Sequence, residues 1–225
     1  DVYSAIEPPT WALLLAESLR VHKYDSVILD FDADRKTLDE SVKSIVDTKA
    51  RLAVFVLYGQ NPNSGTTLMI GASELADQLK KDSSEFKVGF IGSHVSALPQ
   101  EVIKLSYVDF AFINEGVLSL LSILETNLID NIEKIPGIWF KDRDRKPQKG
   151  ALGKIVLTNQ MDKVMPGYAW DLLPKNKFVL DKYRAHFWHT NFLHDKRTPF
   201  AAIYTSLGCQ FGCNFCMINI VNRTS

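Results

Sequence analysis

The sequence lacks several features, and each absence narrows the class of protein. Its three cysteines all lie within the eight residues from Cys209 to Cys216, which is unlike a disulfide framework and suits a reduced compartment. Lys+Arg and Asp+Glu both number 26, so the net charge is zero. The chain therefore lacks the excess of positive charge that would indicate a nucleic-acid partner. No run approaches the roughly 18 apolar residues of a membrane span, and residues 1–9 do not resemble a signal peptide. We expect a cytoplasmic protein with no integral membrane segment.

The length and the two ends indicate a fragment of a longer protein. Apolar residues make up 46% and charged residues 23%, as in a globular chain, and 225 residues exceed one typical domain of roughly 100–200. The sequence begins at Asp1 without an initiator Met and ends at Ser225, shortly after its last cysteine. We therefore expect missing sequence on both sides, including the first strand of the sheet described next.

Helical and strand patterns alternate along the first 128 residues. Short connections between alternating elements predict an α/β fold with a parallel sheet covered on both faces. In such sheets ligands bind beyond the carboxyl ends of the strands, here in the loops that begin at Asp30, Tyr58, Gly92 and Asn114. The expected helices are 10–24, 38–48, 66–81, 99–105 and 117–128, and the expected strands are 27–29, 52–58, 88–91 and 110–113.

The pattern changes after residue 129. Residues 137–141 and 154–158 predict a β-hairpin whose charged tip is exposed. Residues 161–199 are irregular and rich in aromatic side chains, which predicts an ordered linker packed on a neighbour. Residues 201–206 predict a new strand that leads directly to Cys209.

The cysteines form a C-x3-C-x2-C run at Cys209, Cys213 and Cys216. Thiolates are the usual ligands of iron–sulfur clusters, and one loop with these spacings can hold three of the four irons of a cubane cluster. The fourth iron then stays open to a small molecule. A zinc site with a fourth ligand such as His194, or a redox dithiol at Cys213 and Cys216, are the alternatives.

This run resembles the cluster motif of the radical S-adenosylmethionine (SAM) superfamily, including the aromatic Phe215 before the last cysteine. The resemblance implies a [4Fe–4S] cluster on the three cysteines and SAM bound to the fourth iron. It also implies that residues 200–225 begin a partial TIM barrel, most of which is absent.

The upstream sequence is similar to the cobalamin-binding domain that precedes the barrel in one radical SAM subgroup. The similarity lies in Gly92-Ser93-His94, in Asn114-Glu115-Gly116 and in the linker around residues 136–138 and 165–171. It implies a flavodoxin-like (Rossmann-like) domain at 1–131, a hairpin and linker at 132–199, and the barrel start at 200–225. No D-x-H-x-x-G is present, so no histidine ligand to cobalt is implied, and Asn114 replaces the usual first glycine of Gly-Glu-Gly.

The candidate cofactor contacts follow from the loops at the strand ends. The segment after Tyr58 fails as a P-loop, since no Lys follows its glycines, but it either donates N–H groups to a ligand or forms a plain turn. His94 either contacts cobalamin or caps the next helix, and Glu115 either accepts a hydrogen bond from a cofactor or supplies charge at a helix N-terminus. The full set is Tyr58, Gly59, Gln60, Ser64, Gly65, Thr66, Gly92, Ser93, His94, Glu115, Gly116 and Phe215.

The resemblance implies a cobalamin-dependent radical SAM enzyme, with a methyltransferase acting on an unactivated carbon as the favoured activity. A 5′-deoxyadenosyl radical would abstract hydrogen from a small-molecule substrate, and an electron donor such as flavodoxin or ferredoxin would be needed. Two other hypotheses stay open. One is a radical SAM enzyme whose N-terminal module binds a substrate or partner instead of cobalamin, and the other is a zinc-binding interaction protein of flavodoxin-like architecture.

Overall fold

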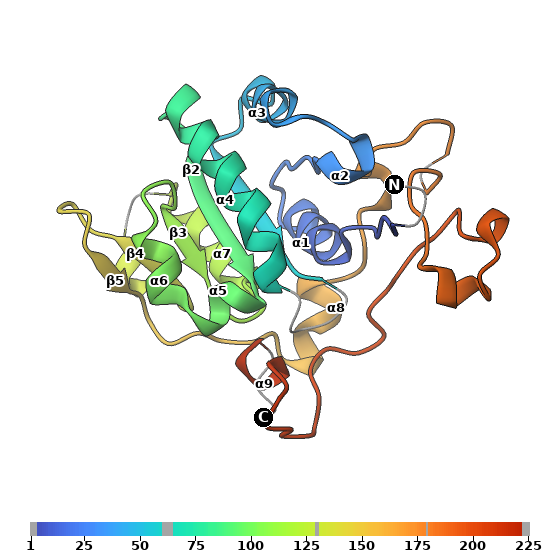
Figure 1. Ribbon diagram of the computed structural model, residues 1–225. Helices are drawn as coiled ribbons and strands as arrows, with labels where there is room; N and C mark the ends of the chain where they lie inside the picture. The colour runs from blue at the N-terminus through green and yellow to red at the C-terminus, as the bar shows by residue number, and fades with distance from the viewer. Residues whose placement is uncertain (1–3, 60–64, 129–130, 179, 222–225) are drawn as a thin grey trace. The chain divides into compact units, whose positions relative to one another are not determined.

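The computed structural model describes residues 4–59, 65–128, 131–178 and 180–221. The chain forms two compact units, and each unit combines two separate segments of sequence (Figure 1). The smaller unit consists of Asp1–Ser44 and Met165–Thr205, and the sheet unit consists of Ile45–Val164 and Ser206–Ser225. The predicted aromatic linker therefore belongs, for most of its length, to the same unit as the first helix.

The sheet unit contains a five-stranded mixed sheet in the order β1-β2-β3-β4-β5. The first three strands are parallel to one another, and the last two are added antiparallel. The α/β fold expected from the alternating pattern is thus present, with an antiparallel hairpin extending the parallel part, and the mostly parallel sheet is consistent with the Rossmann-like fold that the resemblance implies. The strands are β1 (Leu52–Leu57), β2 (Lys87–Gly92), β3 (Phe110–Phe112), β4 (Ile138–Lys141) and β5 (Pro147–Lys149).

The helices that follow the parallel strands form where periodic apolar positions predict them. Pro99 occupies the start of α6, where its missing N–H has no cost, and Gly116 precedes α7. The short α5 was not predicted. The helices of this unit are α4 (Gly65–Asp82), α5 (Ser93–Ala97), α6 (Pro99–Lys104), α7 (Val117–Glu125), η2 (Ile132–Lys134), η3 (Thr158–Gln160), α8 (Met161–Val164) and α9 (Ile218–Val221).

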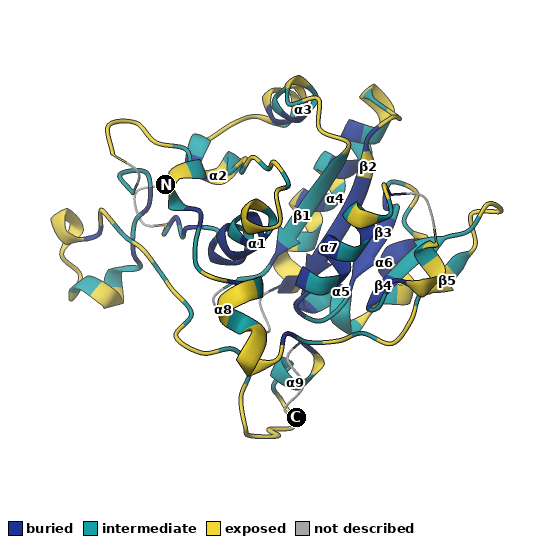
Figure 2. Cartoon of the chain, turned by 180° about the vertical axis from the view of Figure 1, so that it is seen from behind, coloured by how far each residue is buried: buried dark blue, intermediate teal, exposed yellow. Residues whose placement is uncertain are grey.

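The core of the sheet unit lies around β2 and β3, which are the most buried strands in Figure 2. Phe90, Ile91 and Phe112 have no exposed surface. A strand flanked by parallel neighbours is covered on both faces, which explains why β2 is apolar almost throughout. β1 is only half-buried because it forms one edge of the sheet.

The smaller unit packs its first helix against the aromatic segment 165–205. Its buried cluster contains Leu13, Leu173 and Tyr183, and Ile6 forms an antiparallel bridge with Arg184. Its helices are α1 (Thr10–Val21), α2 (Phe31–Asp34), η4 (Trp170–Leu172), η5 (Phe187–Thr190) and η6 (His194–Lys196), and α3 (Leu38–Asp47) crosses into the sheet unit. Within the described parts of the chain, no helix combines the length and apolar character needed to cross a bilayer.

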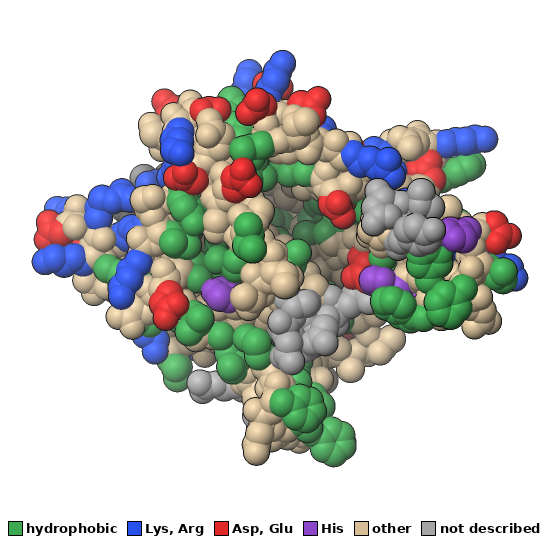
Figure 3. Space-filling model, viewed as in Figure 1, with side chains coloured by type: hydrophobic (Ala, Val, Ile, Leu, Met, Phe, Trp, Pro, Cys, Tyr) green, Lys and Arg blue, Asp and Glu red, His purple; other side chains and the backbone are tan. Residues whose placement is uncertain are grey.

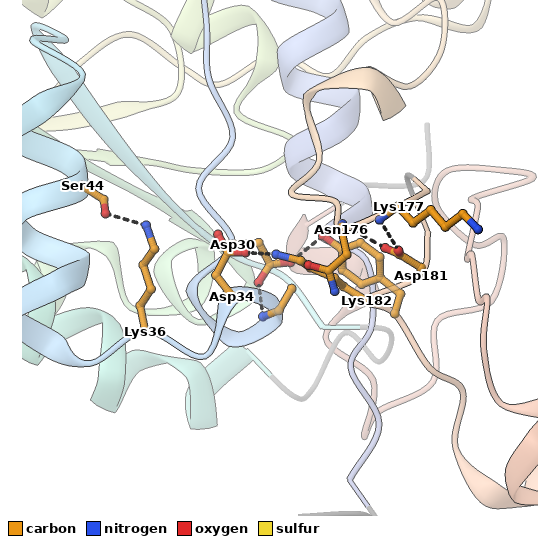
Figure 4. Close-up of polar contacts among 10 residues, drawn as sticks. Asp30, Asp34, Lys36, Ser44, Asn176, Lys177, Asp181 and Lys182 are labelled. Carbon is orange, nitrogen blue, oxygen red and sulfur yellow. Dashed lines mark hydrogen bonds and ion pairs between the residues drawn. The ribbon is translucent and has the colours of Figure 1, made fainter.

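Polar contacts organise the smaller unit around α2 (Figure 4). Asp30 accepts a backbone N–H of α2 at 3.1 Å and the Tyr183 hydroxyl at 3.0 Å, and burial raises the pKa of its carboxyl group. Asp34 forms an ion pair with Lys182, and Asp181 accepts backbone N–H groups from residues 176–178. Asp30 therefore caps a helix, and the loop expected there at the end of a strand is not formed.

Three predicted strands are absent. Residues 27–29, 154–158 and 201–206 have no strand pairing, and Val27 and Ile203 are 61% and 60% exposed. A strand requires a hydrogen-bonding neighbour, and an apolar or β-branched pattern indicates only a tendency toward extended structure. The second arm of the hairpin is β5 rather than residues 154–158 because β4 pairs with residues 147–149 through a shorter turn.

Lys141 on β4 gives the sheet unit a pH-dependent stability. Its Nζ donates to the carbonyl oxygens of Leu105 and Val108 at 2.6 and 2.7 Å, and burial, followed by the charge of Arg145, lowers its pKa from 10.5 to about 8. Between these two values the folded protein has lost a proton that the unfolded chain keeps, so stability rises with pH through this window.

Between pH 8 and pH 10, we expect the free energy of unfolding of the natural chain to rise by about 1 kcal/mol relative to that of Lys141→Met. This value is reduced for solvent screening. Urea unfolding at several pH values checks this. Parallel pH profiles for the two proteins would contradict it.

Candidate functional site

The carboxyl ends of β1, β2 and β3 lie side by side at one edge of the sheet. The parallel register pairs Leu57 with Gly92 and Ile91 with Phe112. The segments that begin at Tyr58, Ser93 and Ile113 therefore leave the sheet at the same edge, which we call the carboxyl edge. Three of the four predicted ligand loops are brought together in this way, and the fourth, at Asp30, belongs to the smaller unit.

Hydrogen bonds connect these segments to one another. The Tyr58 hydroxyl donates to the carbonyl oxygen of Asn114 at 2.6 Å, across the end of β2. The Oγ1 of Thr66 lies 3.0 Å from Nδ1 of His94, which joins the first turn of α4 to α5. His94 lies within α5, and in the part of the chain that the structure describes no side-chain hydrogen bond caps α6, the helix that it was expected to cap. Gln60 and Ser64 lie outside the described residues.

Glycines allow the segments to approach closely. A Cβ at Gly65 would lie 2.2 Å from Oγ of Ser93, and a Cβ at Gly92 would lie 2.5 Å from the carbonyl oxygen of Leu57. Gly116 has φ +70°, and a Cβ there would lie 2.0 Å from Cδ1 of Ile91. The backbone at the carboxyl edge is therefore more tightly packed than any residue with a side chain would permit.

Glu115 is buried, with only 3% of its surface exposed. Its Oε2 accepts the backbone N–H of Val156 at 2.7 Å, which holds the segment after β5 against the N-terminus of α7. Nothing in the sequence pattern indicated this partner, since 41 residues separate the two. The contact gives the carboxylate a structural role within the sheet unit.

The cysteine loop, residues 206–217, presents three reduced thiols. Cys209 and Cys213 are exposed and Cys216 is partly exposed, and the N–H of Cys216 donates to the carbonyl oxygen of Cys213 at 3.1 Å. Phe211 and Phe215 in this loop are 62% and 83% exposed. The space-filling view shows hydrophobic side chains among those on the face of the molecule that it presents (Figure 3). Among the residues that the structure describes, no three Cys, His, Asp or Glu side chains converge as a metal site. The three sulfur atoms are therefore of the kind that iron binds and are reachable from solvent, but they are not gathered around one point.

The loop is anchored at its C-terminal end by α9. Nδ2 of Asn114 donates to the carbonyl oxygens of Ile220 and Val221 at 3.0 and 3.1 Å, and α9 packs against α5. Val221 is buried. Oδ1 of Asn219, also on α9, is buried and has no hydrogen-bond partner among the residues that the structure describes, which leaves an acceptor beside the loop unsatisfied there. The end of the cysteine loop is therefore held at the carboxyl edge.

The histidines that could have completed a zinc site have other neighbours. His186 stacks on Trp188 with ring centroids 4.2 Å apart and lies 3.1 Å from Glu7. His194 packs edge-on against Phe187 in the smaller unit. These contacts give His186 and His194 packing roles within the smaller unit.

The fold is similar to solved structures of a radical SAM methyltransferase. These are structures of TsrM from Kitasatospora setae. One, with tryptophan substrate and the SAM analog aza-SAM bound, has a TM-score of 0.51 and 14% identity over 65% of this chain. Another, with cobalamin and a [4Fe–4S] cluster bound, has a TM-score of 0.53 and 12% identity over 68% of this chain.

The likeness to TsrM concerns the fold. The matched region spans 27% of the length of each of those chains. No protein-family model matches the sequence, and no curated protein matches it.

Proposed function

We propose that this chain is part of a cobalamin-dependent radical SAM enzyme, with methyl transfer to an unactivated carbon as its activity. One observation carries the proposal. The cysteine loop ends in a helix that is bonded to Asn114, in the loop after β3, and packed on α5, which begins at Ser93. Two sets of candidate cofactor residues, far apart in sequence, are thereby connected at one edge of one unit. The likeness of the fold to TsrM supports the same conclusion.

The three thiols would hold the cluster after the loop closes around it. Ligand loops commonly become ordered when metal binds, and the exposed thiols leave the loop free to do so. The buried Oδ1 of Asn219, which has no partner in the described ranges of the chain, favours a rearrangement that brings a donor to it. When bound, the cluster supplies an electron to SAM and cobalamin supplies a methyl group.

The remaining candidate residues would line the cobalamin site. Tyr58 and Gly59 follow β1, Thr66 and His94 form a bonded pair, and Gly116 keeps the backbone close to the end of β2. With Glu115 bonded to Val156, the main role we assign to this edge is to position the corrinoid through backbone groups and short side chains.

The proposal includes a functional division of the chain. Residues 1–131 form the cobalamin-binding-like part, residues 132–199 the hairpin and linker, and residues 200–225 the start of the barrel. A small-molecule substrate and a flavodoxin-like or ferredoxin-like electron donor complete the proposed system in the cytoplasm.

Metal and corrinoid analysis of the 225-residue chain tests this function. After reconstitution with iron and sulfide without oxygen, we expect about four iron atoms per chain and the broad absorbance of a [4Fe–4S] cluster. Equilibrium dialysis against hydroxocobalamin should give about one corrinoid per chain, with or without the cluster.

The outcomes separate the three hypotheses. Iron without corrinoid binding would favour a radical SAM enzyme with a different N-terminal module. One zinc per chain and no iron would favour the zinc-binding interaction protein. Either result would overturn the proposal.

A further inference from the structure

Asn114 has a backbone conformation that usually belongs to glycine. Its φ is +58°, in the left-handed region, and it stands where the resembling subgroup has the first glycine of Gly-Glu-Gly. Asn tolerates this region better than most residues, but glycine would adopt it at lower cost. An asparagine at this conformation suggests that its side chain makes an interaction that glycine could not make, and the contacts of Asn114 show which interaction this is.

Asn114 joins four segments of the sheet unit. Its N–H donates to Oγ of Ser96 on α5 at 2.9 Å, and its carbonyl oxygen accepts from the Tyr58 hydroxyl. These two bonds use only the backbone of Asn114, so glycine could make them equally well. The side chain alone makes the bonds to Ile220 and Val221.

The two side-chain bonds satisfy carbonyl groups at the end of a helix. The last carbonyl groups of a helix have no partner within it, and α9 has only four residues, too few to be stable without outside contacts. The buried Val221 and the packing of α9 on α5 add to these two bonds in fixing this helix. The amide of Asn114 is therefore a main determinant of where the cysteine loop ends.

We propose that Asn114 is a positioning residue for the cysteine loop, holding α9 at the carboxyl edge so that the thiols face the proposed corrinoid site. The two hydrogen bonds from Asn114 to α9, which we call the tether, are present without any cofactor. Their use in cluster binding rests on the proposed function. The ligand class concerned is an iron–sulfur cluster.

Asn114→Gly isolates the tether, because it removes both side-chain donors, keeps both backbone bonds and lowers the cost of the positive φ. Asn191→Gly is the matched control, since Asn191 also has a positive φ, of 51°, and is exposed in the smaller unit. Hydrogen exchange followed by mass spectrometry on the cofactor-free chain should show about tenfold faster exchange at residues 217–221 in Asn114→Gly, with no change there in Asn191→Gly. Equal exchange in the natural chain and Asn114→Gly would overturn the proposal, as would equal acceleration in both variants.

A second measurement tests the use of the tether. After reconstitution, Asn114→Gly should lose iron to a chelator at least threefold faster than the natural chain, at an unchanged urea midpoint, whereas Asn191→Gly should behave like the natural chain. Equal rates of iron loss would overturn the positioning role. If the natural chain takes up no iron, the proposed function fails, and the exchange experiment still decides whether the tether exists.

Discussion

Cys213→Ala is expected to reduce iron incorporation more than tenfold relative to the natural chain. Each thiolate holds one iron of the cluster, and two ligands on an open loop do not retain a cubane. Cys213 is exposed and takes no part in the core, so its loss should change the free energy of unfolding by no more than about 0.5 kcal/mol. Iron and sulfide analysis after anaerobic reconstitution, with urea unfolding in parallel, measures both effects.

Gln210→Ala is the control for this experiment. Gln210 is an exposed residue of the same loop, and its truncation leaves the three thiols in place. It should incorporate iron to the level of the natural chain. Unchanged iron in Cys213→Ala, or an equal loss in both variants, would show that the thiols are not the ligands.

Gly116→Ala is expected to lower the free energy of unfolding by about 3 kcal/mol. Alanine at a φ of +70° costs about 1–2 kcal/mol. Its methyl group would also lie 2.0 Å from Cδ1 and 2.9 Å from Cγ1 of Ile91, so that this fully buried side chain would have to shift. Such overpacking costs about 1–3 kcal/mol more. Urea unfolding of the cofactor-free chain is the appropriate measurement.

Gly71→Ala provides the comparison. Gly71 lies within α4, and a Cβ there would meet no atom within 4 Å. The same substitution should therefore stabilise the protein by about 0.5–1 kcal/mol, because alanine favours the helix. If both variants were equally stable, the close approach of Gly116 to Ile91 would not be a feature of the folded protein in solution.

The sequence predicted the longer helices closely because helical periodicity is a local property, whereas the short helices α2, α5, α8 and α9 were not predicted. The apolar positions of α1 and α4 recur at the spacing of one face, and the observed ends differ from the expected ones by a few residues at most. β1, β2 and β3 were also predicted, since each is apolar along its length and flanked by polar residues or glycine.

Strand pairing could not be predicted in the same way. Residues 27–29 and 201–206 have the composition of strands, but pairing depends on what lies beside them, which a single segment does not encode. The hairpin shows the same limit, because β5 contains Pro147 and two polar residues and would not be identified as a strand without its partner β4.

The candidate site was predicted as four loops, of which the structure brings three together, and the contacts between those three were not predicted. Parallel topology was enough to place Tyr58, Gly92 and Asn114 at one edge. The bonds from Asn114 to α9 span 106 and 107 residues, and no periodicity reports on such a distance. The one available signal was the replacement of glycine by asparagine at residue 114, which is informative only when the surroundings of that residue are known.

The two units are interleaved in the sequence, and this limits which shorter fragments of the protein can be expressed on their own. The chain passes from one unit to the other after Ser44, Val164 and Thr205. A single stretch that begins with the sheet unit at Ile45 and includes both β1 and α9 must also carry the segment Met165–Thr205 of the smaller unit, without the α1 against which it packs. Expressing the sheet with its cysteines as an independent piece would therefore expose Tyr183 and Leu173 to solvent, and a shortened gene would yield a poorly soluble product even though every strand is retained.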